Sequence, residues 1–395
     1  MRSTKEKENY FLSQPHQPFF VLAIINAIVM MLVFALDNKG IINLQISSLL
    51  FHTYTLIYGL FLNVFTGFLF TTFPRFCQSE VLKKSFYVQI FALNSIGSII
   101  FIFASMTSLY ITFASMILLF ISNVFMVLKL RYILKIGTSP TKEDPHWILM
   151  SSSFGLVAHL LFIISLFYSP LESFAIKIAF YMYVVFLTFS VAQRMIPFFC
   201  YSTEQKDLRF VSTVFVFMIL KTLLSIFNEY TYVKGAEIVI DLILAFYLFG
   251  EFIRWKLPIS KSEPIIWVLI LGLLWLPAAF FLDAIILSAE LFLDSSFYYL
   301  GIHALGIGFL TTILIGFATR IIYGHSGQIP NTTKFDVGIF YFIQVVVILR
   351  ILYSISIGGS LDINFLFDIS FVAWIVLFLL WGGKFLPILI FGAKK

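Results

Sequence analysis

The stretch HALGIGFLTTILIGFATRIIYGHSG, residues 303–327, decides the fold. Most of it is apolar enough to cross a bilayer, which takes about 20 such residues. Yet His303 opens it, Arg320 lies near its far end, and glycines recur along it. An ionisable side chain in a membrane span is costly, so it usually faces the bundle interior and serves a function. The stretch therefore predicts a spanning helix with an active group at each end.

The whole composition agrees with a membrane protein. Of the 395 residues, 60% are hydrophobic and 12% are charged, whereas about a quarter of a soluble domain is charged. The apolar runs are too long for barrel strands, so they predict helices. We expect an all-α polytopic membrane bundle, a single integral membrane domain over residues 1–395, with about 12 transmembrane helices. They lie near residues 19–36, 47–73, 86–106, 108–130, 147–168, 174–200, 208–228, 236–255, 264–288, 297–323, 335–358 and 363–391.

The basic residues predict the orientation. With the N-terminus inside, 19 of the 26 Lys and Arg residues fall in inner segments, 3 in outer loops and 4 within helices. Because cytoplasmic loops are enriched in Lys and Arg, both termini are expected in the cytoplasm, with a short cytoplasmic segment at residues 1–18. The basic residues form no dense stripe, which argues against a nucleic-acid partner.

Several enzyme classes are excluded by missing motifs. The chain has no phosphate-binding loop of the G-x-x-x-x-G-K type, no C-x-x-C-H for covalent haem and no H-E-x-x-H for zinc. Cys77 and Cys200 are its only cysteines, so a disulfide framework is not expected. No nucleophile–base pair or carboxylate dyad stands out, and catalytic residues are not predicted.

The predicted helix at 47–73 carries a polar stripe. His52, Gly59 and Asn63 fall within roughly 20° of one another on a helix. Glycine permits close approach of another helix or of a flat cofactor. Both interpretations stay open: a cofactor-binding face, or a tight helix contact with a hydrogen-bonded histidine.

His303 is expected at a depth similar to that of His52, near the outer leaflet. Two neutral imidazoles at one level are what the iron of a membrane haem needs on its two faces. His159, in the middle of the helix at 147–168, is either a further metal ligand or a packed core residue. His325, in the sequence Gly324-His325-Ser326-Gly327, is a metal-ligand candidate at the inner surface.

Two arginines near inner helix ends are candidates for cofactor contacts. Arg194 and Arg320 stay charged, so they either bind carboxylates of a cofactor or close an ion path. Snorkelling to the lipid headgroups is the alternative. Other intramembrane charges either pair between helices or line a polar path; they are Lys221, Asp241, Glu251, Asp283, Arg350 and Lys384.

A weak internal echo joins the second and sixth helices. The second ends FPRFC at residues 73–77 and the sixth ends IPFFC at residues 196–200. Duplication of a four-helix unit would produce this spacing, and so would chance.

Four stretches together resemble the NnrS family, bacterial membrane proteins associated with nitric oxide tolerance. They are HQPFF (16–20), FHTYTLIYGLFLNVFTGFLFTTFPRF (51–76), AQRMIPFF (192–199) and HALGIGFLTTILIGFATRIIYGHSG (303–327). The resemblance implies about twelve spans, a bacterial inner-membrane location, and haem and copper as cofactors. It further implies nitric oxide or an iron–nitrosyl complex as the partner, besides the lipid bilayer.

The chain departs from the family pattern at one place. The pattern on the second helix looks like H-x-H-E, whereas this chain reads His52-Thr53-Tyr54-Thr55. Copper(II) favours clusters of imidazoles, so the change weakens the expectation of copper and leaves that of a non-covalent, b-type haem.

Three functions remain open at this point. The first is a haem-binding membrane protein that responds to nitric oxide. The second is a transporter or channel for a small solute or metal complex. The third is an assembly factor without a cofactor.

Overall fold

The computed structural model of the chain describes residues 10–393 apart from residues 203, 205, 206, 294, 295, 298, 328–331, 360, 362 and 364. Within these residues the chain forms twelve helical rods and no strand, which confirms the predicted all-α membrane bundle. A short 3₁₀ turn, Tyr10–Leu12, precedes them. Residues 1–9 of the predicted cytoplasmic segment lie outside the description. The first helix begins at His16, within the segment that was expected to precede it.

Nine rods are single α-helices. They are α1 (His16–Asn38), α4 (Lys84–Thr107), α5 (Leu109–Ile136), α6 (Glu143–Ser165), α9 (Phe210–Ile226), α10 (Thr231–Arg254), α11 (Pro264–Leu293), α14 (Lys334–Gly358) and α15 (Phe365–Phe391). Ten of the twelve rods are long and apolar enough to cross a membrane. The other two are α9, which is shorter, and α10, whose apolar stretch is broken by charges.

The remaining three rods each change helix type along their length. Rod 2 consists of α2 (Ser48–Tyr54), the π-helix η2 (Thr55–Phe61) and α3 (Leu62–Phe76). Rod 6 consists of α7 (Leu171–Lys177), the π-helix η3 (Ile178–Val185) and α8 (Phe186–Phe199). Rod 10 consists of α12 (Leu300–His303), the π-helix η5 (Ala304–Thr311) and α13 (Thr312–His325).

The twelve rods form three units of four, so the echo seen in the sequence has a structural basis. Unit 1 runs from α1 to α5, unit 2 from α6 to α10, and unit 3 from α11 to α15. In each unit the first helix packs on the second rod and the third helix packs on the fourth. The fourth helix of each unit packs on the first helix of the next, with α15 closing the ring against α1.

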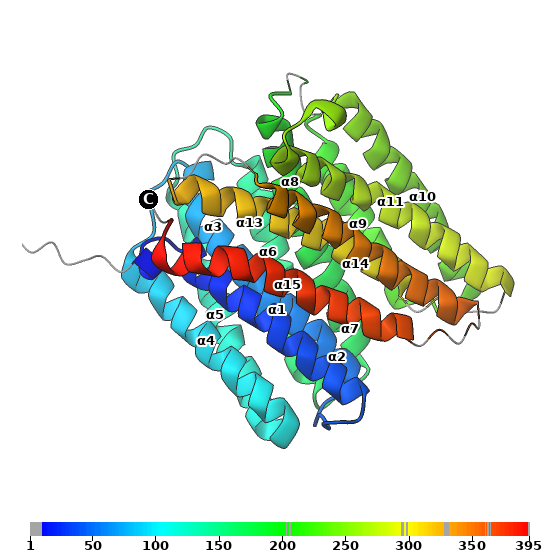
Figure 1. Cartoon of the computed structure of the whole chain (residues 1–395). Helices are drawn as coiled ribbons and strands as arrows, with labels where there is room; N and C mark the ends of the chain where they lie inside the picture. The colour runs from blue at the N-terminus through cyan, green and yellow to red at the C-terminus, as the bar shows by residue number, and fades with distance from the viewer. Residues whose placement is uncertain are drawn as a thin grey trace, which may run out of the picture.

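Rods 2, 6 and 10 form the centre of this ring. In their most apolar stretches 78–94% of the residues are buried, against 33–67% in the other candidate spans. The outer helices leave one side to lipid, as α4 does at one edge of the bundle in Figure 1 and α10 at the opposite edge. The central position of rods 2 and 10 fits the prediction that polar groups on these helices face the bundle interior.

The three central rods also share their ends. Cys77 and Cys200 follow rods 2 and 6, and the next residues, Gln78 and Tyr201, have positive φ values of 51° and 52°. Gly327 takes the same left-handed conformation after rod 10. A left-handed residue commonly ends a helix by capping its last carbonyls.

Both described ends of the chain lie at the same end of the bundle (Figure 1). A Cβ on Gly392 would lie 3.3 Å from the ring of Tyr10. This agrees with an even number of spans. Below, "inner" denotes this end and "outer" the opposite one, following the predicted orientation.

Candidate functional site

His52 and His303 face each other at the outer end of rods 2 and 10. Their ring centres are 6.5 Å apart and the ring planes differ by 25°. An imidazole nitrogen lies about 2 Å from a metal ion and its ring centre about 1 Å further, so imidazoles on opposite sides of one ion are about 6 Å apart. The pair predicted from the sequence is therefore brought together at the separation that one metal ion requires.

The hydrogen bonding of His303 leaves one ring nitrogen available. Its Nδ1 lies 2.8 Å from the carbonyl oxygen of Tyr299. Because a carbonyl oxygen only accepts, Nδ1 carries the proton and Nε2 keeps its lone pair. Metal-binding histidines typically hold their second nitrogen in this way.

The surroundings of the pair suit a flat aromatic group. Phe34 on α1 lies 4.3 Å from the ring of His52, centre to centre, and Phe367 on α15 lies next to Phe34. A Cβ on Gly306 would meet only Phe180, at 4.0 Å, so rod 10 leaves room one turn beyond His303. Arg350 on α14 is close enough to both imidazoles to interact electrostatically. Its charge suits an acidic substituent of a bound group.

Gly59 and Asn63 have protein partners. The side-chain amides of Asn26 and Asn63 both donate to the Gly59 carbonyl, at 2.9 and 2.8 Å. A Cβ on Gly59 would lie 2.5 Å from Met30 Sδ. The two asparagines satisfy this carbonyl within the π-helix, where a buried unpaired carbonyl would be costly. The structure supports the helix-contact interpretation for both residues, and their contact with a cofactor stays a prediction.

His159 lies apart from the outer pair and is fully buried. Its Nε2 is 2.9 Å from Tyr54 Oη and its Nδ1 is 3.4 Å from Asn123 Nδ2. Its ring stacks on Tyr58 with centres 3.8 Å apart. Since both ring nitrogens have partners, the arrangement favours a packed core histidine over a metal ligand.

His325 meets a histidine that the sequence did not single out. His16 on α1 lies with its ring centre 4.7 Å from that of His325, at the inner end. His16 is buried and its Nδ1 has no hydrogen-bond partner. The separation is too short for ligands on opposite faces of one ion. The signal was hidden because His16 precedes the first apolar run, where a solvated residue is expected.

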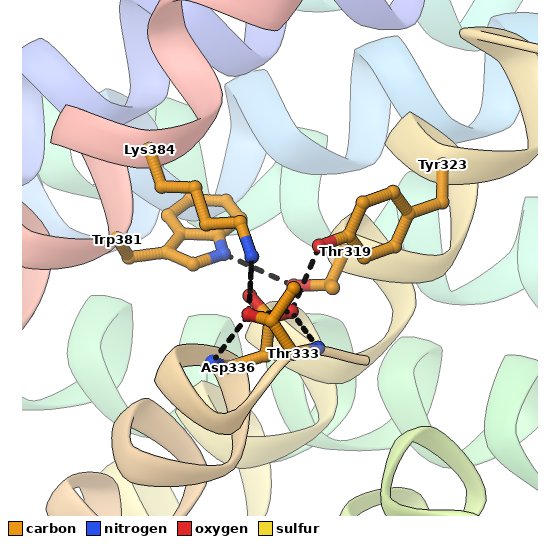
Figure 2. A network of polar contacts seen from close by, with 6 residues as sticks. All are labelled: Thr319, Tyr323, Thr333, Asp336, Trp381 and Lys384. Carbon is orange, nitrogen blue, oxygen red and sulfur yellow. Dashed lines mark hydrogen bonds and ion pairs between the residues drawn. The ribbon is translucent and has the colours of Figure 1, made fainter. Parts of the chain in front are cut away.

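A polar network fixes the rod that carries His325 (Figure 2). Asp336 on α14 accepts from Tyr323 Oη at 2.8 Å and pairs with Lys384 Nζ at 2.6 Å. Thr333 forms a capping box with Asp336. Trp381 on α15 donates to Thr319 on rod 10 at 3.0 Å. The network ties rod 10 to α14 and α15 two residues before His325.

Arg194 and Arg320 lie at the inner end. Arg194 pairs with Asp144 at 2.8 Å and lies over the ring of Phe76. Arg320 stacks on Phe199, with its guanidinium carbon 3.9 Å from the ring centre. At about 1.5 Å per residue, Arg320 lies roughly 25 Å along rod 10 from His303. A group held by the outer histidines is therefore out of reach, and the predicted carboxylate contact would concern another group.

Neither cysteine is poised as a ligand or nucleophile. Burial raises the pKa of the Cys77 thiol to about 11, and burial raises the pKa of the Cys200 thiol to about 11 as well. The thiolate is the reactive and metal-binding form. Both thiols are free of disulfides and neutral at physiological pH.

A buried ionic cluster lies beside rod 10, where Asp283 approaches Gly301. Lys221 contacts three carboxylates within unit 2 and at the start of unit 3. The structure thus shows pairing between helices, one of the two alternatives expected for Lys221, Asp241 and Asp283, whereas Glu237 was not noticed in the sequence. The available signal was the spacing of Glu237 and Asp241, which places them on one face of α10.

A family model described as NnrS protein matches residues 10–391, nearly the whole chain. No curated protein matches the chain significantly. The family model covers all twelve rods, and the chain belongs to the NnrS family.

Proposed function

We propose that this member of the NnrS family is a haem-binding protein of the bacterial inner membrane that acts in the response to nitric oxide. His52 and His303 would hold the haem iron. The main support for this assignment is that the ring centres of His52 and His303, on two different central rods, are 6.5 Å apart. The response to nitric oxide rests on the resemblance of the four quoted stretches.

The residues around the pair support a b-type haem. Tyr299 holds the Nδ1 proton of His303 and so directs its lone pair away from the backbone. Phe34 provides an aromatic surface beside His52, and the absence of a side chain at Gly306 leaves room for a flat group. Arg350 is a suitable partner for a propionate. Bound there, haem would supply one-electron chemistry.

Copper fits poorly on rod 2. The second histidine of the family pattern is replaced by Tyr54, whose hydroxyl is 2.9 Å from His159 Nε2. Copper(II) favours clusters of imidazole nitrogens. Tyr54 supplies no nitrogen in place of the missing histidine, and its hydroxyl already occupies Nε2 of His159. We therefore propose no copper at this position.

The alternative, a transporter or channel for a small solute or metal complex, has less support. The central rods enclose an apolar cavity of about 30 Å³, lined by residues such as Phe65, Leu310 and Phe317, with Thr188 as its polar side chain. A polar solute or metal complex needs polar groups along its path. The centre of the ring offers hydrocarbon instead.

An absorption spectrum with metal analysis tests the proposal. The purified protein from haem-replete cells should be red and contain iron, with a Soret band that shifts on reduction. His52→Ala and His303→Ala should each lose most of the bound haem. His146→Ala is the matched control because His146 is exposed on α6, away from the pair. A colourless wild-type protein, or equal haem in all four proteins, would refute the proposal.

A further inference from the structure

The ammonium of Lys221 is surrounded by carboxylates inside the bundle. Its Nζ lies 2.8 Å from Glu237 Oε1, 2.6 Å from Asp241 Oδ2 and 2.6 Å from Asp283 Oδ2. These side chains come from α9, α10 and α11. An ammonium has three donors, and here each donor has its own carboxylate.

The cluster is shielded from solvent. The side chains of Lys221 and Asp241 are fully buried, that of Glu237 is 2% exposed and that of Asp283 15%. The ring of Tyr181 on rod 6 covers the ammonium from 5.6 Å. Water and mobile ions therefore do little to screen these charges.

The charges of the cluster do not balance. Three ionised carboxylates against one ammonium leave two negative charges uncompensated. Lys177, on rod 6, is the other cation that interacts with Glu237 and Asp283, and it neutralises at most one of them. A buried uncompensated charge is strongly unfavourable, so the cluster requires one more positive charge.

Two carboxylate oxygens of the cluster are free to bind the additional positive charge. Glu237 Oε2 and Asp241 Oδ1 are buried and have no hydrogen-bond partner. Both residues lie four positions apart on α10, and ligand atoms of Glu237, Asp241 and Asp283 lie within 4.8 Å of one another. A metal cation prefers six or more oxygen ligands, whereas a proton needs one carboxyl oxygen and one acceptor.

We propose that Glu237 and Asp241 share one exchangeable proton, which makes the Lys221 cluster a proton-binding site inside the membrane. The groups facing the shared proton are Lys221 from α9, Asp283 from α11, and Lys177 and Tyr181 from rod 6. Lys234 and Glu290, paired at 3.2 Å and partly exposed, lie towards the outer surface on α10 and α11. Protons would reach the cluster from that side.

The cluster touches the backbone of rod 10 close to His303. A Cβ on Gly301 would clash with the side chain of Asp283 as it is placed, so the glycine permits this close approach. A change of charge in the cluster thus occurs next to the backbone of Gly301, two residues before His303. The proton site itself does not depend on haem being bound there.

Infrared spectroscopy of the purified protein in lipid nanodiscs tests the proposal. At neutral pH the wild type should show the carbonyl stretch of a protonated carboxyl group, shifted to lower frequency in D₂O. Glu237→Gln or Asp241→Asn should abolish this band, and either variant is sufficient if the other fails to fold. Glu290→Gln, in the exposed pair on the neighbouring helix, should retain it.

Three outcomes would overturn the proposal. One is a wild type without a protonated-carboxyl band at neutral pH. Another is a band that persists in a folded Glu237→Gln or Asp241→Asn protein. The third is a band that disappears when sodium replaces potassium at constant pH, which would make the occupant a metal cation. Because none of these readouts involves haem, failure here is distinguishable from failure of the haem proposal.

Discussion

The two ends of rod 10 are built alike but differ in charge and spacing. At each end a histidine of rod 10 faces a second histidine. At each end, too, an aspartate that pairs with a lysine contacts rod 10 two residues before that histidine: Asp336 contacts Tyr323, and Asp283 contacts Gly301. At the inner end the rings are 4.7 Å apart, and one lysine, Lys384, pairs with one aspartate, Asp336. At the outer end the rings are 6.5 Å apart, and three carboxylates surround Lys221. The lysine and the aspartate at the inner end balance each other, whereas the carboxylates at the outer end lack a positive charge.

The strongest test of this difference removes a histidine from each end. His303→Ala should lose most of the bound haem, because one of two axial ligands is missing. His325→Ala and His16→Ala should retain it, since a separation of 4.7 Å is too short for ligands on opposite faces of one iron. The Soret absorbance per mole of protein is the measurement. Equal loss from both ends would mean that the spacing does not decide which pair binds.

The lysines at the two ends should differ in their effect on stability. Lys221→Met removes the ammonium that contacts all three carboxylates and leaves Lys177 as their remaining cationic neighbour. Removing one partner of a buried ion pair costs about 3–5 kcal/mol. Lys384→Met should cost about 1 kcal/mol, because Lys384 is partly exposed. Asp336 also keeps its hydrogen bonds from Tyr323 and Thr333.

Unfolding of both variants in mixed micelles by a denaturing detergent measures this difference. Asp241→Asn in the Lys221→Met background should recover part of the lost stability, because it removes one unpaired charge. Similar stabilities for the two lysine variants would contradict the charge imbalance at the outer end.

Much of the fold could be predicted from the sequence, because the length of each apolar run indicates the position and length of one helix. All twelve predicted helices occur, ten of them long and apolar enough to cross a membrane, and α14 at Lys334–Gly358 begins one residue from its predicted start. The three π-helices could not be predicted, since an apolar run reads the same in α- and π-geometry. Pairing between helices was one expectation for Lys221, Asp241 and Asp283. The full cluster with Glu237 could not be predicted, because its members converge only when α9, α10 and α11 pack with one particular rotation.

Two glycines on rod 10 provide a milder comparison. Gly301→Ala should destabilise the protein by about 1–3 kcal/mol, the usual cost of overpacking, because the new methyl group would clash with Asp283. Gly324→Ala, at the inner end, is the control, since no atom lies within 4 Å of its added Cβ. Thermal unfolding of the two variants measures the difference, and a Gly301→Ala protein as stable as the control would show that Asp283 can move away.

The smallest effect is expected at Tyr54. Tyr54→Phe removes the hydroxyl that bonds His159 Nε2 and should cost about 1 kcal/mol, the net contribution of one hydrogen bond. The haem spectrum should not change, because His159 lies apart from the outer pair. A changed Soret band in Tyr54→Phe would instead connect His159 to the metal site.

The central claim is that imidazoles from rods 2 and 10 bind the two faces of one iron. Electron paramagnetic resonance of the oxidised protein tests it most directly. The wild type should give the low-spin ferric signal of two histidine ligands, and His303→Ala should convert the remaining haem to a high-spin signal. A high-spin wild type, or a low-spin signal unchanged in both His52→Ala and His303→Ala, would contradict the account.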